Sequence, residues 1–249
     1  MLSGVVFDLD GVFVDSHPVH KRAWRSFFAS VGKEVSDSDL DFILEGRRRK
    51  DILIHFLGEL SDAELQEYGS KKDEFYRMEC ETLEPVSGCV ELIKRVSNAG
   101  LCLGVATSAS RARASWTLEE LKIAEYFDVV VTGDDVVQSK PDPTIYRLAA
   151  QGLCLSPERL VAVEDSVCGV RAAKSAGLRC LGIAAPTKID ELTAAGADRV
   201  LLNLAGLSIR DLEEMFSYLA QTGSTSGTIA TPAEAPLPES EVPADSVDS

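Results

Sequence analysis

Apolar and polar residues alternate along the chain in blocks that predict strands and helices in turn. Between the predicted strands, apolar side chains recur at the three- and four-residue spacing of amphipathic helices. From residue 88 onward helix and strand alternate regularly, which predicts parallel strands joined by right-handed helical connections. The fold class is therefore α/β, with a doubly wound parallel sheet. The predicted strands cover residues 5–7, 101–106, 129–131, 160–163, 180–184 and 198–202.

Residues 15–85 depart from this alternation because they show helical spacing and no strand. Helices are predicted over 18–31 and 51–57, with Ser16 as the cap of the first. Ser36 to Asp39 and Ser61 to Glu64 have the spacing of capping boxes that open two more helices. We therefore expect an all-helical cap domain at 15–85, inserted into a core made of 1–14 and 86–221.

The composition changes after residue 221. Residues 223–249 are rich in Ser, Thr, Pro and Ala, and contain five acidic residues but no Lys or Arg. Such a segment cannot bury enough apolar surface to order itself. Residues 222–249 are accordingly predicted to be a disordered acidic tail.

Charge and cysteine content narrow the class of protein. The net charge of −15 over 249 residues argues against nucleic-acid binding, which needs a basic surface. The six cysteines show no CxxC spacing, which favours reduced thiols. No apolar run approaches the roughly 18 residues of a membrane span. The first strand begins too early for a signal peptide to precede it. We therefore expect a cytoplasmic protein without a membrane or nucleic-acid partner.

Polar side chains follow several of the predicted strands at the point where each strand ends. Because parallel strands end at the same edge of a sheet, these side chains should converge on one site. Each of them alone has an ordinary explanation as a solvated turn, a helix cap or a surface lysine. Together they predict a catalytic site. The residues are Asp8, Asp10, Thr107, Ser108, Lys140, Glu164 and Asp165.

The charges at this edge indicate the chemistry. Four carboxylates close together cannot all stay ionised without a cation, and Mg²⁺ prefers oxygen ligands. With Lys140 and the hydroxyl of Thr107, the pocket would suit a phosphoryl group. Asp8 could attack phosphorus and form an aspartyl phosphate. Asp10 could protonate the leaving oxygen and later take a proton from the acceptor.

The set DxDGV at 8–12, Thr107, Lys140-Pro141 and Glu164-Asp165 resembles the haloacid dehalogenase superfamily of phosphotransferases. The resemblance covers residues 4 to about 205 and points to members with a helical cap between the first two motifs. It implies a Rossmann-like core and an Asp at position 10 typical of phosphatases and phosphomutases. The resemblance implies Asp8 as nucleophile and Asp10 as general acid/base. It implies Thr107, Ser108 and Lys140 as phosphate binders. The implied Mg²⁺ ligands are Asp8, the main-chain carbonyl of Asp10, Glu164 and Asp165.

Three positions of the predicted cap resemble the β-phosphoglucomutase branch of that superfamily. His20 and Lys72 would assist Asp10, and Arg49, in a segment that begins at Gly46, would grip a distal phosphate. Gly46 is accordingly expected at the substrate. The alternatives are that His20 is a packed helix residue and that residues 47–50 form a solvated basic face.

Three functions remain. The first is a Mg²⁺-dependent phosphatase of a small phosphorylated metabolite. We expect this metabolite to be a sugar phosphate and the protein to be a monomer. The second is a β-phosphoglucomutase-type phosphomutase with the same aspartyl-phosphate intermediate. The stretch from Ala109 to Ala112 does not clearly reproduce the Ser-Lys-Asn of the mutase, which favours the phosphatase. The third is a non-catalytic binding module, against which the intact set of catalytic residue types argues.

Overall fold

A single parallel sheet forms the centre of the computed structural model, which describes residues 1–80 and 82–217; the predicted tail at 222–249 lies outside them. Within the described residues the sheet has six strands in the order β3-β2-β1-β4-β5-β6, and every pair is parallel. This confirms the predicted fold class. The strands are β1 (Gly4–Phe7), β2 (Cys102–Ala106), β3 (Val129–Val131), β4 (Leu160–Glu164), β5 (Arg179–Ile183) and β6 (Arg199–Leu201).

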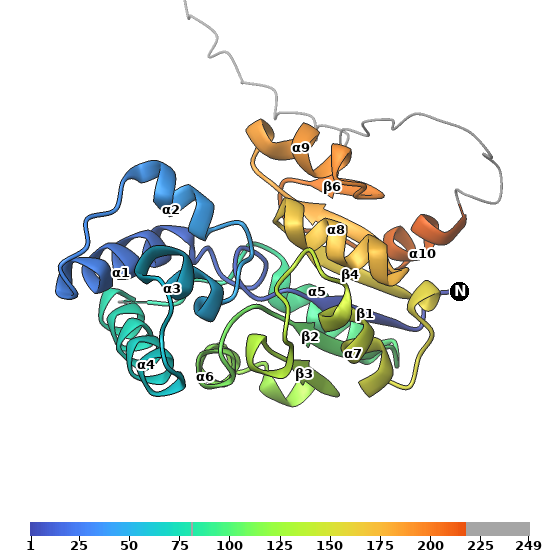
Figure 1. The fold of residues 1–249 in the computed structure, drawn as a ribbon. Coiled ribbons are helices and arrows are strands. Elements are labelled where there is room, and N and C mark those ends of the chain that lie inside the picture. The colour runs from blue at the N-terminus through green and yellow to red at the C-terminus, as the bar shows by residue number, and fades with distance from the viewer. Residues whose placement is uncertain (81, 218–249) are drawn as a thin grey trace, which may run out of the picture.

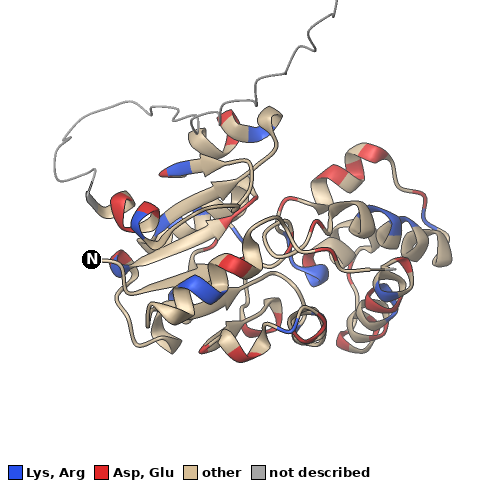
Figure 2. Cartoon of the chain, turned by 180° about the vertical axis from the view of Figure 1, so that it is seen from behind, with Lys and Arg blue, Asp and Glu red and all other residues tan. Residues whose placement is uncertain are grey.

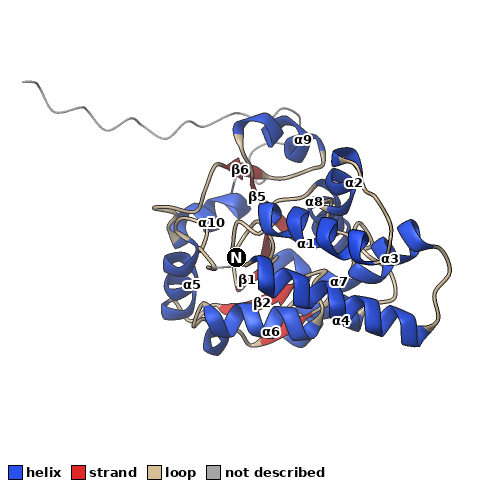
Figure 3. Cartoon of the chain, turned by 90° about the vertical axis from the view of Figure 1, so that its left-hand side faces the viewer, coloured by secondary structure: helices blue, strands red, loops and turns tan. Residues whose placement is uncertain are grey.

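Helices cover both faces of the sheet (Figure 3). Along β1, Val5 and Phe7 face the cluster with α5 (Cys89–Asn98), α6 (Arg111–Glu120) and α10 (Ile209–Ser217). Val6 faces the cluster with α7 (Thr144–Gly152), α8 (Val167–Ala176) and α9 (Ile189–Ala194). The sequence pattern did not predict α9 because its six residues bury only Leu192. Short 3-10 turns lie at η1 (Ala124–Tyr126), η2 (Gly133–Asp135), η3 (Pro157–Arg159) and η4 (Pro186–Lys188).

Four helices between β1 and α5 form a separate bundle beside the sheet (Figure 1). They are α1 (His17–Ser30), α2 (Asp37–Ile43), α3 (Arg49–Leu57) and α4 (Asp62–Glu79). Their own apolar core is built around Trp24, Phe27 and Phe28. Both predicted capping boxes, at Ser36 and Ser61, are present. We call α1–α4 the cap and the sheet with its other helices the core; the exact domain boundaries stay a prediction.

The two linkers between cap and core run side by side. Val14 of the first linker forms a parallel bridge with Asp10 and an antiparallel bridge with Pro85 of the second. The amide of Val86 donates to the carbonyl of Phe13 at 2.8 Å. The chain therefore leaves the core and returns to it at one place, directly beyond the end of β1.

Ser16 stands at the predicted cap position of α1, but its side chain does not cap the helix. Its backbone is helical (φ −86°, ψ −10°) rather than extended, and its side chain makes no capping bond to α1. A cap residue normally needs an extended backbone for its side chain to reach the first amides of the helix. The Ser16 hydroxyl donates instead to a carboxylate oxygen of Asp10, at 2.7 Å.

Acidic and basic positions are interspersed over the cap and the core, as the ribbon seen from behind shows (Figure 2). The described helices include none with the length and apolar character needed to cross a bilayer.

Candidate active site

Asp8, Lys140 and Glu164 form a buried ionic network at the carboxyl edge of the sheet. Asp8 follows β1 directly, and Glu164 ends the neighbouring strand β4. The Lys140 Nζ donates to Asp8 Oδ1 at 2.7 Å and to Glu164 Oε1 at 2.6 Å. The Tyr146 hydroxyl donates to the same Glu164 oxygen at 2.6 Å. Lys140 is only 2% exposed, so the network is closed to bulk water in this arrangement.

Burial controls the protonation of this network. Burial raises the pKa of Asp8 to about 8; Lys140 opposes the shift, while Glu164 and Asp165 add to it. Burial alone would lower the pKa of Lys140, but Asp8 and Glu164 outweigh it and the pKa is raised. One lysine therefore does not compensate three neighbouring acids at neutral pH, and a further cation would relieve the excess negative charge.

Asp8, Glu164 and Asp165 have the geometry and chemistry to hold such a cation. One carboxylate oxygen from each lies within 4.8 Å of the others. Two glycines make room for the acids. A Cβ on Gly11 (φ +72°) would lie 1.9 Å from Asp165 Oδ2, and a Cβ on Gly169 would lie 2.0 Å from the Glu164 carboxyl group. An all-oxygen donor set of this kind fits Mg²⁺.

The three acids differ in how their oxygens are used. Both oxygens of Glu164 accept hydrogen bonds, from Lys140 and Tyr146 on one side and from Ser166 on the other. Asp165 Oδ2 lies 3.1 Å from Nε2 of His17. For Asp8 and Asp165, by contrast, the polar contacts involve one carboxylate oxygen each: Oδ1 of Asp8 with Lys140 and Oδ2 of Asp165 with His17. Asp8 and Asp165 are thus the acids best placed to bind a metal directly.

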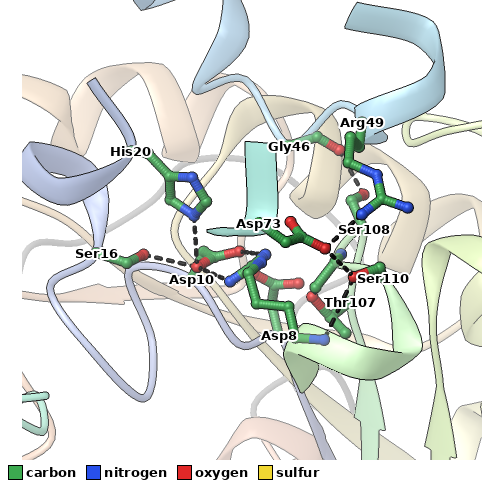
Figure 4. Close-up of polar contacts among 12 residues, drawn as sticks. Asp8, Asp10, Ser16, His20, Gly46, Arg49, Asp73, Thr107, Ser108 and Ser110 are labelled. Carbon is green, nitrogen blue, oxygen red and sulfur yellow. Dashed lines mark hydrogen bonds and ion pairs between the residues drawn. The ribbon is translucent and has the colours of Figure 1, made fainter. Parts of the chain in front are cut away.

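The carboxylate of Asp10 does not join this acidic group, contrary to the expectation of four converging carboxylates. It lies among hydrogen-bond donors instead. Arg113 donates to both oxygens of Asp10, with Nη1 at 2.9 Å from Oδ1 and Nη2 on Oδ2. His20 Nε2 lies 3.0 Å from Oδ1 (Figure 4). Burial would raise the pKa of Asp10, but Arg113 and His20 outweigh it and hold the pKa well below its usual range. Of the oxygen atoms of Asp10, only the main-chain carbonyl oxygen is left as a possible metal ligand.

His20 and Lys72 extend from Asp10 into the cap as a hydrogen-bonded chain. Lys72 Nζ lies 3.1 Å from His20 Nδ1. Burial and the nearby Lys72 lower the pKa of His20 to about 3, so the imidazole is neutral at pH 7. A neutral imidazole that accepts from Lys72 at Nδ1 carries its proton at Nε2 and donates it to Asp10. Burial and the nearby Arg113 lower the pKa of Lys72 to about 7.

The remaining predicted site residues lie at the ends of β2 and α3. The Ser108 hydroxyl donates to the carbonyl of Gly46 at 2.6 Å, which links core and cap. Thr107 is 1% exposed, and its Oγ1 accepts from the amide of Ala109 at 3.1 Å. Ser108 and Gly46 line the cavity between cap and core, whereas Thr107 does not in this arrangement.

Arg49 lies on an acidic residue of the cap. Its Nη1 donates to the carbonyl of Gly69 at 3.0 Å and to Oδ2 of Asp73. Ser110 of the core donates to the same Asp73 oxygen at 2.8 Å (Figure 4). The side chain expected to grip a distal phosphate therefore has a carboxylate of the protein as its partner.

A cavity of about 60 Å³ separates the cap from the carboxyl edge of the sheet. Ligand pockets usually measure about 300–1,000 Å³, so this one is too small for a sugar phosphate. A wider groove of about 930 Å³ adjoins it and shares Arg49, Asp73, Ser108 and Ser110 with it, so the cap covers the acids closely but leaves the site open on that side. The ionisable side chains lining the cavity are Asp8, Asp10, His17, His20, Arg47, Arg49, Lys72, Asp73, Arg113 and Asp165.

Sequence reasoning missed Arg113 and Asp73. Arg113 lies in the first turn of α6, three residues after its cap Ser110. A cation there opposes the helix dipole, which is a signal that it has another partner. Asp73 directly follows Lys72 in a helix rich in charged residues, where nothing distinguishes it from exposed acids.

Comparison with known proteins identifies the family. The family model described as haloacid dehalogenase-like hydrolase matches residues 5–183. A phosphorylated carbohydrates phosphatase of Thermotoga maritima is 36% identical over 179 residues, covering 71% of this chain and 82% of that protein. A β-phosphoglucomutase of Bacillus subtilis is 30% identical over 222 residues, covering 86% of this chain and 95% of that protein.

A solved structure gives the same result. A CbbY variant of Rhodobacter sphaeroides in complex with xylulose-(1,5)bisphosphate superposes with a TM-score of 0.75 at 31% identity. The match covers 85% of this chain and 99% of that chain. The parallel sheet, the acids at its carboxyl edge and these matches agree. The chain belongs to the haloacid dehalogenase-like hydrolases and is similar to their β-phosphoglucomutase and carbohydrate phosphatase members.

Proposed function

We propose that this protein is a Mg²⁺-dependent phosphatase of a small sugar phosphate, acting through an aspartyl phosphate on Asp8. The observation that carries the proposal is the contrast between the surroundings of Asp8, which lies with Lys140 among other acids, and those of Asp10, which contacts Arg113 and His20. These surroundings raise the pKa of Asp8 and lower that of Asp10. Two acids with environments that separate their pKa values are typical of a site that assigns them different roles.

The metal would be held by Asp8 and Asp165, with the main-chain carbonyl of Asp10. Glu164 lies beside them and would need to give up a hydrogen bond to bind directly. When bound, Mg²⁺ would neutralise the acids and polarise the phosphoryl oxygens. Asp8 would hold the metal through one carboxylate oxygen and attack phosphorus with the other. The new bond joins Asp8 to the phosphoryl group, and the bond to the leaving oxygen breaks.

Asp10 moves the protons on both sides of that intermediate. In this structure Arg113 keeps Asp10 ionised, which suits the second step, in which it takes a proton from the attacking water. In the first step Asp10 must donate a proton to the leaving oxygen. We infer that this requires Arg113 to move off Asp10 when substrate is bound. The neutral His20, supported by Lys72, keeps Asp10 oriented in both steps.

A screen of phosphorylated metabolites with Mg²⁺ tests the proposal, scoring both released phosphate and rearranged product. We expect phosphate release from one or more sugar monophosphates. An Asp8→Asn variant should lose turnover while its circular dichroism and melting curve stay unchanged. Full turnover in this variant would contradict the nucleophile assignment, and the exposed Asp62→Asn provides a matched control for an Asp-to-Asn change.

The second candidate is a β-phosphoglucomutase-type phosphomutase with the same intermediate. The small cavity over the acids favours it, because a space of about 60 Å³ leaves little room for the water that would hydrolyse the aspartyl phosphate. The two functions differ in the acceptor, which is water in one and a sugar hydroxyl in the other. Isomer interconversion that needs a catalytic bisphosphate and releases no net phosphate would establish the mutase.

Compartment and oligomeric state complete the proposal. All six cysteines are free thiols, which supports a reducing compartment such as the cytoplasm. Every residue assigned to the site comes from this one chain, which supports a monomer as the active form. Sedimentation at assay concentration checks the latter.

A further inference from the structure

One wall of the cavity consists of donors that point at a single carboxylate, Asp73 of α4. Arg49 from α3 and Ser110 from the start of α6 both donate to its Oδ2 (Figure 4). Asp73 is 5% exposed, so these contacts are shielded from water. A carboxylate held in this way stands where an anionic group of a ligand would meet the same two donors.

Arg49 packs against the cap beside Gly69. A Cβ on Gly69 would lie 2.6 Å from Nε and 2.7 Å from Cζ of Arg49, so the missing side chain leaves the space in which the guanidinium lies. The carbonyl of Gly69 accepts a second hydrogen bond from Arg49 Nη1. The guanidinium of Arg49 therefore already has hydrogen-bond partners within the cap, at Asp73 and Gly69.

The other cations that line this cavity are also paired within the chain, whereas Lys50, Lys71 and Arg77 line only the wider groove beside it. Lys72 faces His20 and, with a pKa of about 7, carries only part of its charge at neutral pH. The remaining arginines of the cavity have carboxylate partners, as does Lys140 at the sheet edge. The pairs are Arg113 with Asp10, Lys140 with Asp8 and Glu164, and Arg47 with Glu45 at the rim.

We propose that Asp73 is a specificity residue that selects monophosphates with a neutral remainder, such as a polyol. The inference rests on the proposed function and narrows its substrate class. A second phosphate on the substrate would meet Asp73 at close range and compete with it for Arg49 and Ser110. Like charges brought together at a binding site are strongly unfavourable, so a bisphosphate is rejected. Hydroxyl groups can share the same donors without that repulsion.

Binding of glucose 6-phosphate and glucose 1,6-bisphosphate tests this by calorimetry with Mg²⁺. The measurement uses the Asp8→Asn background, in which neither compound is turned over. We expect the monophosphate to bind at least about tenfold more tightly than the bisphosphate. Adding Asp73→Asn should shift that ratio at least about tenfold toward the bisphosphate. The neighbouring exposed acid gives the matched control, Glu74→Gln, which should leave the ratio unchanged.

Ser110→Ala separates charge from cap closure. This substitution removes the hydrogen bond that the Ser110 hydroxyl donates to Asp73 across the boundary of core and cap, but leaves the carboxylate of Asp73 in place. We expect the binding ratio to stay at its starting value, although the loss of the α6 cap lowers the melting temperature. A shift as large as that of Asp73→Asn would assign the effect to cap opening and overturn the proposal.

Two results in the Asp8→Asn background alone would also overturn the proposal: tighter binding of the bisphosphate, or no binding of the monophosphate. Neither depends on Asp73→Asn folding correctly. Failure of the proposed function has a different signature. It would show as absence of phosphate release in the wild-type screen, whatever the binding ratio.

Discussion

Mg²⁺ binding to the metal-free protein should release protons near neutral pH, because Asp8 is largely protonated there. Burial raises its pKa to about 8. About one molecule in a hundred then has Asp8 ionised at pH 6, and about one in ten at pH 7. Since only the carboxylate binds the cation, ionisation of Asp8 alone should lower the apparent Kd for Mg²⁺ about tenfold from pH 6 to 7 and about fivefold from pH 7 to 8, with no further change well above. A tenfold change corresponds to about 1.4 kcal/mol of binding free energy.

The same shift sets the pH dependence of stability. A carboxyl group with a raised pKa stabilises the folded state in its protonated form, and this contribution is lost as the pH rises through the folded pKa. The metal-free protein should therefore become less stable as the pH rises toward and through 8. Added Mg²⁺ should raise the melting temperature most at the alkaline end of that range.

Calorimetry in buffers of different ionisation enthalpy measures the number of protons released. Asp165 contributes to that number because burial raises its pKa as well. His17 contributes too: burial would lower its pKa, but its contact with Asp165 raises it. In Asp8→Asn the number of protons released at pH 7 should fall by about one. An unchanged number in this variant, or a wild-type Kd that is constant from pH 6 to 8, would refute the reasoning.

Three further predictions concern the groups around the acids. Gly169→Ala places a methyl group 2.0 Å from the Glu164 carboxyl group. We therefore expect a lower melting temperature and at least about tenfold weaker Mg²⁺ binding. An unchanged melting temperature would contradict this expectation. Arg113→Met leaves Asp10 without its buried ion pair and should cost about 3 kcal/mol in urea unfolding, whereas a loss below about 1 kcal/mol would count against that pair. Lys72 has a pKa of about 7 and is cationic below it, so kcat/KM for a sugar phosphate should fall as the pH rises through 7. In Lys72→Met this fall in kcat/KM above pH 7 should be absent. If the pH profiles of the wild type and of Lys72→Met superimpose, Lys72 does not act on the substrate.

The core of the fold and its acids could be predicted because their signals are local. The apolar run before Asp8 marks a buried strand, and the two-residue spacing to Asp10 places both at its carboxyl end. The same reasoning placed Glu164 after β4 and Lys140 in a loop nearby. These residues indeed meet, since parallel strands share one edge.

The environment of each acid could not be predicted because it depends on residues far apart in sequence. Arg113 reaches Asp10 across 103 positions, and Ser110 reaches Asp73 across 37. Strand spacing groups Asp10 with the other acids. Its side chain instead turns toward Arg113, because a partly buried carboxylate is stabilised by a bidentate guanidinium partner. No pattern in α4 separates the buried Asp73 from the exposed Glu74 beside it.

The adjacent linkers at Val14 and Pro85 have an evolutionary consequence. An insert whose two ends lie side by side can be lengthened, shortened or replaced without moving the strands from which it emerges. The sheet edge that carries Asp8 and Glu164 can then stay as it is while the helices above it change. A substitution in the cap, at a position such as Asp73, leaves the strands beneath it in place. A pair of neighbouring linkers thus lets recognition and chemistry evolve at different rates.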